Sequence, residues 1–149
     1  RQVYVMMEGS GTLWVLNGST AFAIQGIRYP PPDIDIQTDK AGGYAMEALL
    51  RECTLAPVAF SPTGNGVIRS HFGRFDVDGV IVEVIGSAEK KVDGVWEAPD
   101  DLKPLIRWRN YKGMRLPVLD LYYEADSYAK MQRPEKAAEI AAYAKALRG

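Results

Sequence analysis

The chain predicts an α/β (α+β) fold in which a mixed β-sheet carries packed helices. Its 149 residues are 47% hydrophobic and 25% charged, which is the composition of a globular protein with one good core. Segments with a strand-like period of two alternate along the chain with segments of helical period. We expect a single domain over residues 1–149, with a mixed sheet core in 1–118 and a helical pair in 119–149.

The hydrophobic pattern also gives the order of the elements. Runs of β-branched and apolar residues predict strands, whereas alanine-rich and amphipathic runs predict helices. Asp78-Gly79 is a hairpin signal, and Asp93-Gly94 is a second turn signal before a less regular stretch. The first expected helix ends near Gly9, and the others cover 19–27, 42–53, 120–131 and 134–147. The expected strands cover 12–17, 33–38, 56–60, 67–76, 80–86 and 115–118.

Two carboxylates alternate with isoleucines on the strand expected at 33–38. Side chains alternate between the faces of a strand, so Asp33 and Asp35 share one face while Ile34 and Ile36 enter the core. Neighbouring carboxylates repel each other unless a cation lies between them, and Mg²⁺ is often held by one or two carboxylates plus phosphate oxygens. The alternative is a solvated strand face that follows a run of prolines.

A Gly-Ser pair lies between the first expected strand and the helix that follows it. Gly18 allows the backbone to approach a ligand closely, and Ser19 supplies a hydroxyl at a helix start, where free N–H groups favour phosphate. In the simpler interpretation Ser19 only caps the helix. Together with the acidic pair, this turn predicts a site for a triphosphate and its metal.

These residues resemble the signature of the polymerase-beta-like, or minimal (AbiEii-like), nucleotidyltransferases. The signature is Gly-Ser, a gap, and then Asp-hydrophobic-Asp-hydrophobic, with thirteen residues between Ser19 and Asp33 here. Almost the whole chain is similar to a group of small bacterial nucleotidyltransferases. The further segments that carry this similarity are Gln25-Gly26, 33–39, Ser70-His71-Phe72-Gly73, Asp78-Gly79, Pro117-Val118-Leu119 and Arg133 with Lys136.

The resemblance implies a third acidic residue on a later strand. Glu83 is the one charge in the apolar run at 80–85, so we expect it to join Asp33 and Asp35 at one or two magnesium ions and to help deprotonate the acceptor. The alternative for Glu83 is an ion pair with Arg69 or Arg74 across a hairpin.

The triphosphate also needs cationic partners. Arg28 precedes the acidic pair, and Arg69 and Arg74 flank the Ser70–Gly73 segment. We rank Lys130, Arg133 and Lys136 highest, because a spacing of three residues places side chains near one helical face unless Pro134 breaks the helix. Each of these cations has an alternative role as solvated surface charge.

The resemblance implies transfer of a nucleoside monophosphate from a nucleoside triphosphate, ATP by family habit, to an unidentified acceptor with release of pyrophosphate. A second hypothesis is an antitoxin or binding module that keeps this fold and acts through a protein partner. Its contact surface would be the tyrosines of the terminal helices, namely Tyr122, Tyr123, Tyr128 and Tyr143.

The remaining features of the composition argue against several other classes of protein. One histidine and one cysteine cannot build a zinc site alone, so we expect His71 to pack and Cys53 to be a buried small hydrophobe. A net charge of −1 argues against a broad nucleic-acid surface. With no apolar stretch long enough for a membrane helix and no signal peptide, we expect the cytoplasm, and a start at Arg1 suggests that a few residues precede it.

Overall fold

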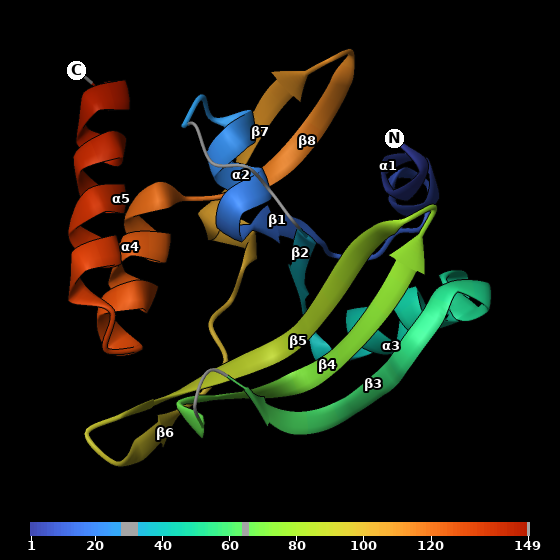
Figure 1. Ribbon diagram of the computed structural model, residues 1–149, viewed down its shortest axis with the longest axis horizontal. Helices are drawn as coiled ribbons and strands as arrows, with labels where there is room; N and C mark the ends of the chain where they lie inside the picture. The colour runs from blue at the N-terminus through green and yellow to red at the C-terminus, as the bar shows by residue number, and fades with distance from the viewer. Residues whose placement is uncertain (28–32, 64–65, 149) are drawn as a thin grey trace.

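The computed structural model describes residues 1–27, 33–63 and 66–148, and its eight strands form one mixed sheet (Figure 1). The strand order is β3-β4-β5-β2-β1-β8-β7, and β6 pairs with β5. The strands are β1 (Val15–Asn17), β2 (Asp33–Thr38), β3 (Thr54–Thr63), β4 (Ile68–Val77), β5 (Val80–Val92), β6 (Val95–Glu97), β7 (Ile106–Tyr111) and β8 (Met114–Leu119). The helices are α1 (Gln2–Glu8), α2 (Gly18–Ile24), α3 (Lys40–Leu49), α4 (Leu121–Lys130) and α5 (Pro134–Arg148), with short 3-10 turns at Arg51–Cys53 and Lys103–Leu105.

The centre of the sheet brings together strands that are distant in sequence. β2 is antiparallel to β1 and parallel to β5, while β1 is parallel to β8. In this register Asp35 lies opposite Glu83 on one side and opposite Asn17 on the other. The sheet is therefore mixed, as predicted, and its register aligns the predicted acidic strands.

Three elements differ from the sequence-based expectation. β5 continues to Val92, and Asp93-Gly94 is the turn of a second hairpin that leads into β6. β7 occupies part of the stretch expected to be irregular, because its polar sequence around Trp108 forms an exposed edge strand paired only with β8. The helix expected at 42–53 ends at Leu49 and continues as a 3-10 turn.

The two faces of the central strands are packed differently. Ile36, Val82 and Val84 are fully buried in the main core, which also includes Met46 of α3. Figure 1 shows α3 behind β3, β4 and β5. Because side chains alternate along a strand, Asp35 and Glu83 point to the opposite face.

The terminal helices form a second layer. α4 and α5 lie side by side in Figure 1 and share an apolar cluster with α2, in which Phe22, Leu121 and Ile140 are buried. This cluster holds the helical pair next to the Gly18 turn. Among the described residues, no helix is both long and apolar enough to span a membrane.

Candidate nucleotide and metal site

Three carboxylates from two neighbouring strands interact on the face opposite α3. Burial, Glu83 and Asp33, in that order, raise the pKa of Asp35 to about 6, and Lys136 partly offsets this shift. Burial and Asp33 also raise the pKa of Glu83. The predicted acids are therefore brought together in a setting that lacks sufficient positive charge, and a bound cation would favour their ionised forms.

Glu83 also has the ion-pair partner that the alternative interpretation required. Arg74 lies opposite Glu83 in the β4–β5 register, and its Nε is 4.0 Å from Glu83 Oε2. The other candidate, Arg69, is bonded to Glu89 at 2.7 Å and stacks on Trp96 instead. Glu83 therefore interacts both with the acidic cluster and with Arg74.

Gly18 is fixed by its own conformation and by the acidic pair. Its φ is +67°, and an added Cβ would lie 2.6 Å from Asp35 Oδ2. Helix α2 begins at Gly18 with Asn17 at the N-cap position, so Ser19 lies inside the helix and does not cap it. Thr20 Oγ1 donates to the carbonyl of Asp33 at 2.9 Å and ties this helix to β2. The turn and the acids are thus one structural unit.

Glu124 is a functional candidate that the sequence analysis missed. It is 3% exposed, and its Oε1 accepts a hydrogen bond from the Gly18 N–H at 2.8 Å. Burial first, and then Asp35, raise its pKa well above the usual range, although the Gly18 bond acts in the other direction. A signal was present, since Glu124 falls between Leu121 and Ala125 on the apolar face of an amphipathic helix.

The three cations ranked highest do not share one helix. α4 ends at Lys130 and α5 begins at Pro134, with Gln132 at a φ of +62° between them. Proline cannot donate the backbone bond that would continue a helix, so the predicted common face does not form.

Only part of this cationic set approaches the acids. Lys136 is half-buried, lies over the rings of Phe22 and Tyr128, and interacts with both Asp35 and Glu124. Its pKa is lowered, first by burial and then by Arg133. Lys130 instead pairs with Glu97 at 3.1 Å and with Asp126 at 3.4 Å. Arg133 lies over Tyr128, and Arg28 is outside the described residues.

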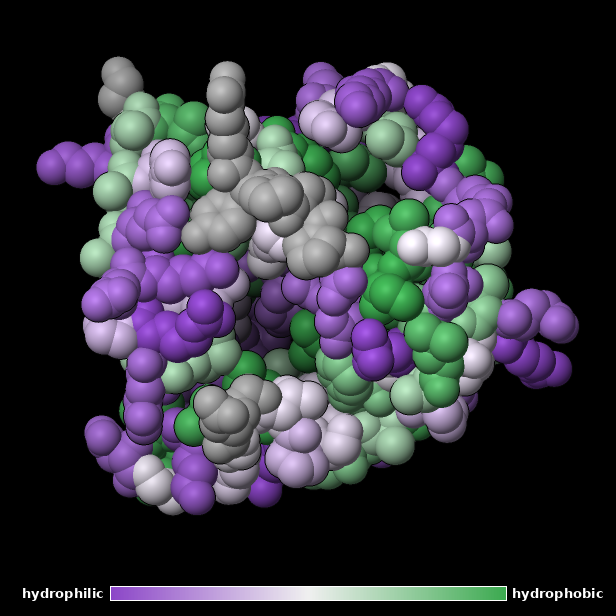
Figure 2. All heavy atoms as spheres, in the orientation of Figure 1, coloured by the Kyte–Doolittle hydropathy of each residue, from purple (hydrophilic) through white to green (hydrophobic). Residues whose placement is uncertain are grey.

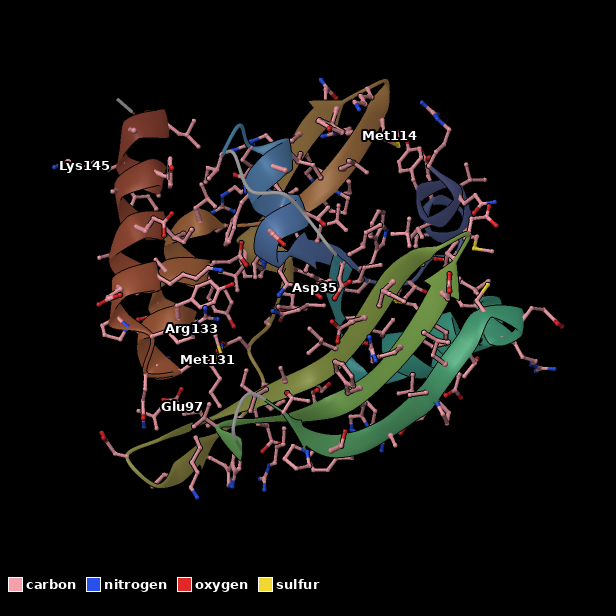
Figure 3. All side chains as sticks on the ribbon, viewed as in Figure 1. Asp35, Glu97, Met114, Met131, Arg133 and Lys145 are labelled. Atoms are coloured by element: carbon pink, nitrogen blue, oxygen red, sulfur yellow. The ribbon has the colours of Figure 1, made fainter. Side chains whose placement is uncertain are left out.

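The face that carries these groups is hollowed. Figure 2 shows an opening near the centre of the view with hydrophilic side chains inside it. In Figure 3, Asp35 lies near this centre, and Met131 and Arg133 lie on the side of the helical pair. Within the part of the chain that the structure describes, no three His, Cys, Asp or Glu side chains form a ready-made metal cage.

The single histidine and cysteine have no place among the acids. His71 Nδ1 is 3.1 Å from the hydroxyl of Tyr44, and its ring also contacts Phe60. Burial, followed by Lys40, lowers the pKa of His71. Cys53 is half-buried against the main core. His71 therefore makes packing contacts as expected, whereas Cys53 packs against the core but is only half-buried and not buried as expected.

Comparison with known proteins identifies the family. Residues 1–142 match the family described as aminoglycoside-2''-adenylyltransferase. The chain belongs to this family. A protein of Thermotoga maritima, provisionally identified as a nucleotidyltransferase, is 40% identical over 96% of this chain and 88% of its own, with a TM-score of 0.83. None of the curated proteins compared with the chain matches it.

Two more distant structures share the fold of this family member. ANT(2'')-Ia in complex with adenylyl-2''-tobramycin is 10% identical, with a TM-score of 0.54 over 98% of this chain and 92% of its own. The lincomycin-bound lincosamide antibiotic adenylyltransferase LnuA is 13% identical, with a TM-score of 0.58 over 93% of this chain and 94% of its own. Family membership establishes the protein as a nucleotidyltransferase and confirms the resemblance found from the signature residues.

Proposed function

We propose that this nucleotidyltransferase moves a nucleoside monophosphate from ATP to a hydroxyl group of a small acceptor, using magnesium held by Asp33, Asp35 and Glu83. The observation that carries this proposal is the repulsion among the three carboxylates. Burial, Glu83 and Asp33 together raise the pKa of Asp35 to about 6. Carboxylates held together in this way favour a divalent cation. The family to which the chain belongs is described by adenylyl transfer to an aminoglycoside, which supports ATP as the donor and a hydroxyl as the acceptor.

The side chains fit magnesium better than a metal that requires a closed protein cage. Mg²⁺ keeps several water ligands and is commonly bound through one or two carboxylates plus substrate phosphates. An acidic cluster without a ready-made three-ligand cage is consistent with a site completed by the triphosphate. Bound magnesium would neutralise charge on the attacking and leaving oxygens of the reaction.

The remaining parts of the site supply position and charge. The Gly18-Ser19 turn lies against Asp35, so a triphosphate bound at this turn would lie beside the acids. Lys136 interacts with Asp35 and is the best placed of the described cations to contact the phosphates. Arg133 and Lys130 are weaker candidates, because Arg133 is exposed and Lys130 is paired with Glu97.

Glu83 accepts the proton in this proposal. The acceptor oxygen attacks the α-phosphorus, the bond between this phosphorus and the oxygen leading to the β-phosphate breaks, and pyrophosphate leaves. The acceptor proton passes to Glu83, directly or through one water. Burial and Asp33 raise the pKa of Glu83 in the metal-free cluster, and a bound cation would favour its ionised form, which is the form that accepts a proton.

Isothermal titration calorimetry tests the donor and the metal together. ATP, GTP, CTP and UTP are titrated with and without Mg²⁺ into the wild type and into Asp33→Asn/Asp35→Asn. A matched control is Asp78→Asn/Asp93→Asn, which removes two exposed turn carboxylates at φ values that asparagine also adopts. We expect magnesium-dependent ATP binding in the wild type and the control only.

Two results would contradict the proposal. Binding that persists in Asp33→Asn/Asp35→Asn would refute the metal assignment. No binding of any nucleotide would favour the protein-partner hypothesis, for which Tyr122 and Tyr143 offer exposed contacts on the terminal helices.

A further inference from the structure

The Gly18 turn opens helix α2 without a capping bond from its own N-cap residue. The first N–H groups of a helix have no partner inside the helix, and an N-cap side chain usually accepts a hydrogen bond from one of them. Asn17 occupies this position, but its side chain makes no such bond. The partner of the Gly18 N–H comes from a distant part of the chain, since Glu124 Oε1 of α4 accepts it at 2.8 Å.

This hydrogen bond is buried and long-range. Glu124 is 3% exposed and lies 106 residues after Gly18 in the sequence. Its other oxygen, Oε2, is buried and makes no hydrogen bond with any residue that the structure describes. The hydrogen bonding described for this carboxyl is therefore directed to the turn alone.

The position of the turn determines how closely it approaches the acids. Gly18 has a φ of +67°, and a Cβ added there would lie 2.6 Å from Asp35 Oδ2. A turn this close to a proposed metal ligand cannot move without changing the space that the metal and the triphosphate share. In an active site, a displacement of about 1 Å can lower the rate by about 10²-fold. A contact that fixes the Gly18 turn therefore bears on the reaction.

Packing of α4 alone does not account for a carboxyl at position 124. Taking a carboxylate out of water carries a large free-energy penalty, which one backbone hydrogen bond only partly offsets. Burial first, and then Asp35, raise the pKa of Glu124, while the Gly18 bond and Lys136 act in the other direction. A leucine or methionine here would pack the helix without this penalty. The contact that such a side chain could not make is the bond to the Gly18 N–H.

We propose that Glu124 is a positioning residue for nucleotidyl transfer. Through its bond to the Gly18 N–H, it fixes the Gly18-Ser19 turn against Asp35 before the nucleotide binds, so that the metal and the triphosphate meet in one geometry. Because Glu124 is 3% exposed, it acts through the turn and not on the triphosphate itself. This role rests on the metal and nucleotide site proposed above.

Two substitutions of similar length separate the hydrogen bond from the charge and from the packing. Glu124→Gln removes the charge but keeps an oxygen that accepts from the Gly18 N–H. Glu124→Met keeps the length and the helix propensity but has no oxygen. Glu124→Asp withdraws the carboxyl by one carbon and is a second variant without the bond. The matched control is Ile140→Val, which removes one buried methylene from the apolar cluster between α4 and α5.

Two measurements follow the bond and its consequence. Amide hydrogen exchange of Gly18, recorded by NMR without nucleotide, reports the bond, and calorimetric titration of Mg-ATP reports the Kd. We expect Glu124→Gln to keep both values close to those of the wild type. In Glu124→Met and Glu124→Asp, the Gly18 amide should exchange about tenfold faster and Mg-ATP should bind about tenfold more weakly, the scale for leaving one buried donor unpaired. Ile140→Val should lower the melting temperature and leave the Kd unchanged.

Three outcomes would overturn the inference. Wild-type affinity in Glu124→Met would show that the bond does not position the site. An equal loss in Glu124→Gln and Glu124→Met would assign the effect to the charge, and an equal loss in Ile140→Val would assign it to general loosening of the helices. All three leave Mg-ATP binding by the wild type, and with it the proposed function, intact. Failure of the wild type to bind Mg-ATP would instead contradict the proposed function and the positioning role together.

Discussion

The two faces of the central strands show how one stretch of sequence can serve stability and chemistry separately. On the α3 face, Ile36, Val82 and Val84 are fully buried among apolar neighbours. On the other face, Asp35 and Glu83 lie side by side in the sheet, each partly buried and each with a raised pKa. Since neighbouring residues on a strand face opposite ways, substitutions one position apart should have opposite kinds of effect.

The largest expected effect is on the acidic face. Asp35→Asn removes one carboxylate from the proposed metal site, and we expect nucleotidyl transfer to fall by about 10³-fold, the scale for loss of a central electrostatic contributor. The fold should persist, because the substitution removes a poorly compensated charge and keeps the side-chain shape. Pyrophosphate release measures the activity, and circular dichroism measures the fold. Full activity in this variant would exclude Asp35 from the site.

The neighbouring substitution on the apolar face should do the reverse. Ile36→Ala empties space in the main core, and we expect the free energy of unfolding to fall by about 3 kcal/mol, within the range for large-to-small core changes. The turnover rate of the molecules that remain folded should change little. Urea denaturation gives the stability, and activity is measured well below the unfolding midpoint. A thousandfold loss of turnover in folded protein would show that the two faces are not separable.

The third prediction concerns the acidic face and the pH dependence of the free energy of unfolding. The pKa of Asp35 rises from 3.8 to about 6 on folding, so the folded state holds this proton more tightly than the unfolded chain does. The resulting stabilisation is complete below about pH 4 and is lost as the pH rises through 6. We expect the stability of the wild type relative to Asp35→Asn to fall by about 2 kcal/mol between pH 4.5 and 7.5 in metal-free buffer.

Urea denaturation of both proteins over this pH range measures the difference. Groups that do not interact with Asp35 titrate alike in the two proteins, so the difference reports Asp35 together with the neighbours coupled to it, namely Asp33, Glu83 and Glu124. A difference that stays constant with pH would mean that the carboxyl is better solvated than its burial indicates. Added Mg²⁺ should stabilise the wild type at pH 7.5 and leave Asp35→Asn nearly unchanged.

The contrast between the faces also explains what the sequence could predict. Strict alternation over Asp33–Ile36 fixes both a strand and its two faces, so the sheet and the acidic pair were predictable from local pattern. The shared register of Asp35 and Glu83 is a long-range property, and the family resemblance, not the periodicity, paired these two strands.

Other features depend on tertiary contacts that the local pattern does not encode. Glu124 looks like an ordinary helix residue until α4 packs against the Gly18 turn and buries it. The sequence of β7 is largely polar and did not predict a strand, because an edge strand has little apolar surface to bury. The role of Lys136 depends on the direction that α5 takes after Pro134, which spacing along one continuous helix could not anticipate.

The smallest predicted effect distinguishes two lysines of the helical pair. Lys136→Gln removes a half-buried charge that interacts with Asp35, and we expect the KM for ATP to rise by about tenfold, which corresponds to ~1.4 kcal/mol. Lys130→Gln removes a charge that already pairs with Glu97 and Asp126 near the surface, and such pairs contribute about 0.2–1 kcal/mol to stability. Because Lys130 pairs with these surface carboxylates and Lys136 is the lysine that interacts with Asp35, the KM of Lys130→Gln for ATP should stay within about twofold of the wild-type value. Steady-state pyrophosphate release at saturating Mg²⁺ measures both. Equal increases in KM would place the triphosphate along both helices, and an increase confined to Lys130→Gln would move it away from Asp35, toward the β5–β6 hairpin that carries Glu97.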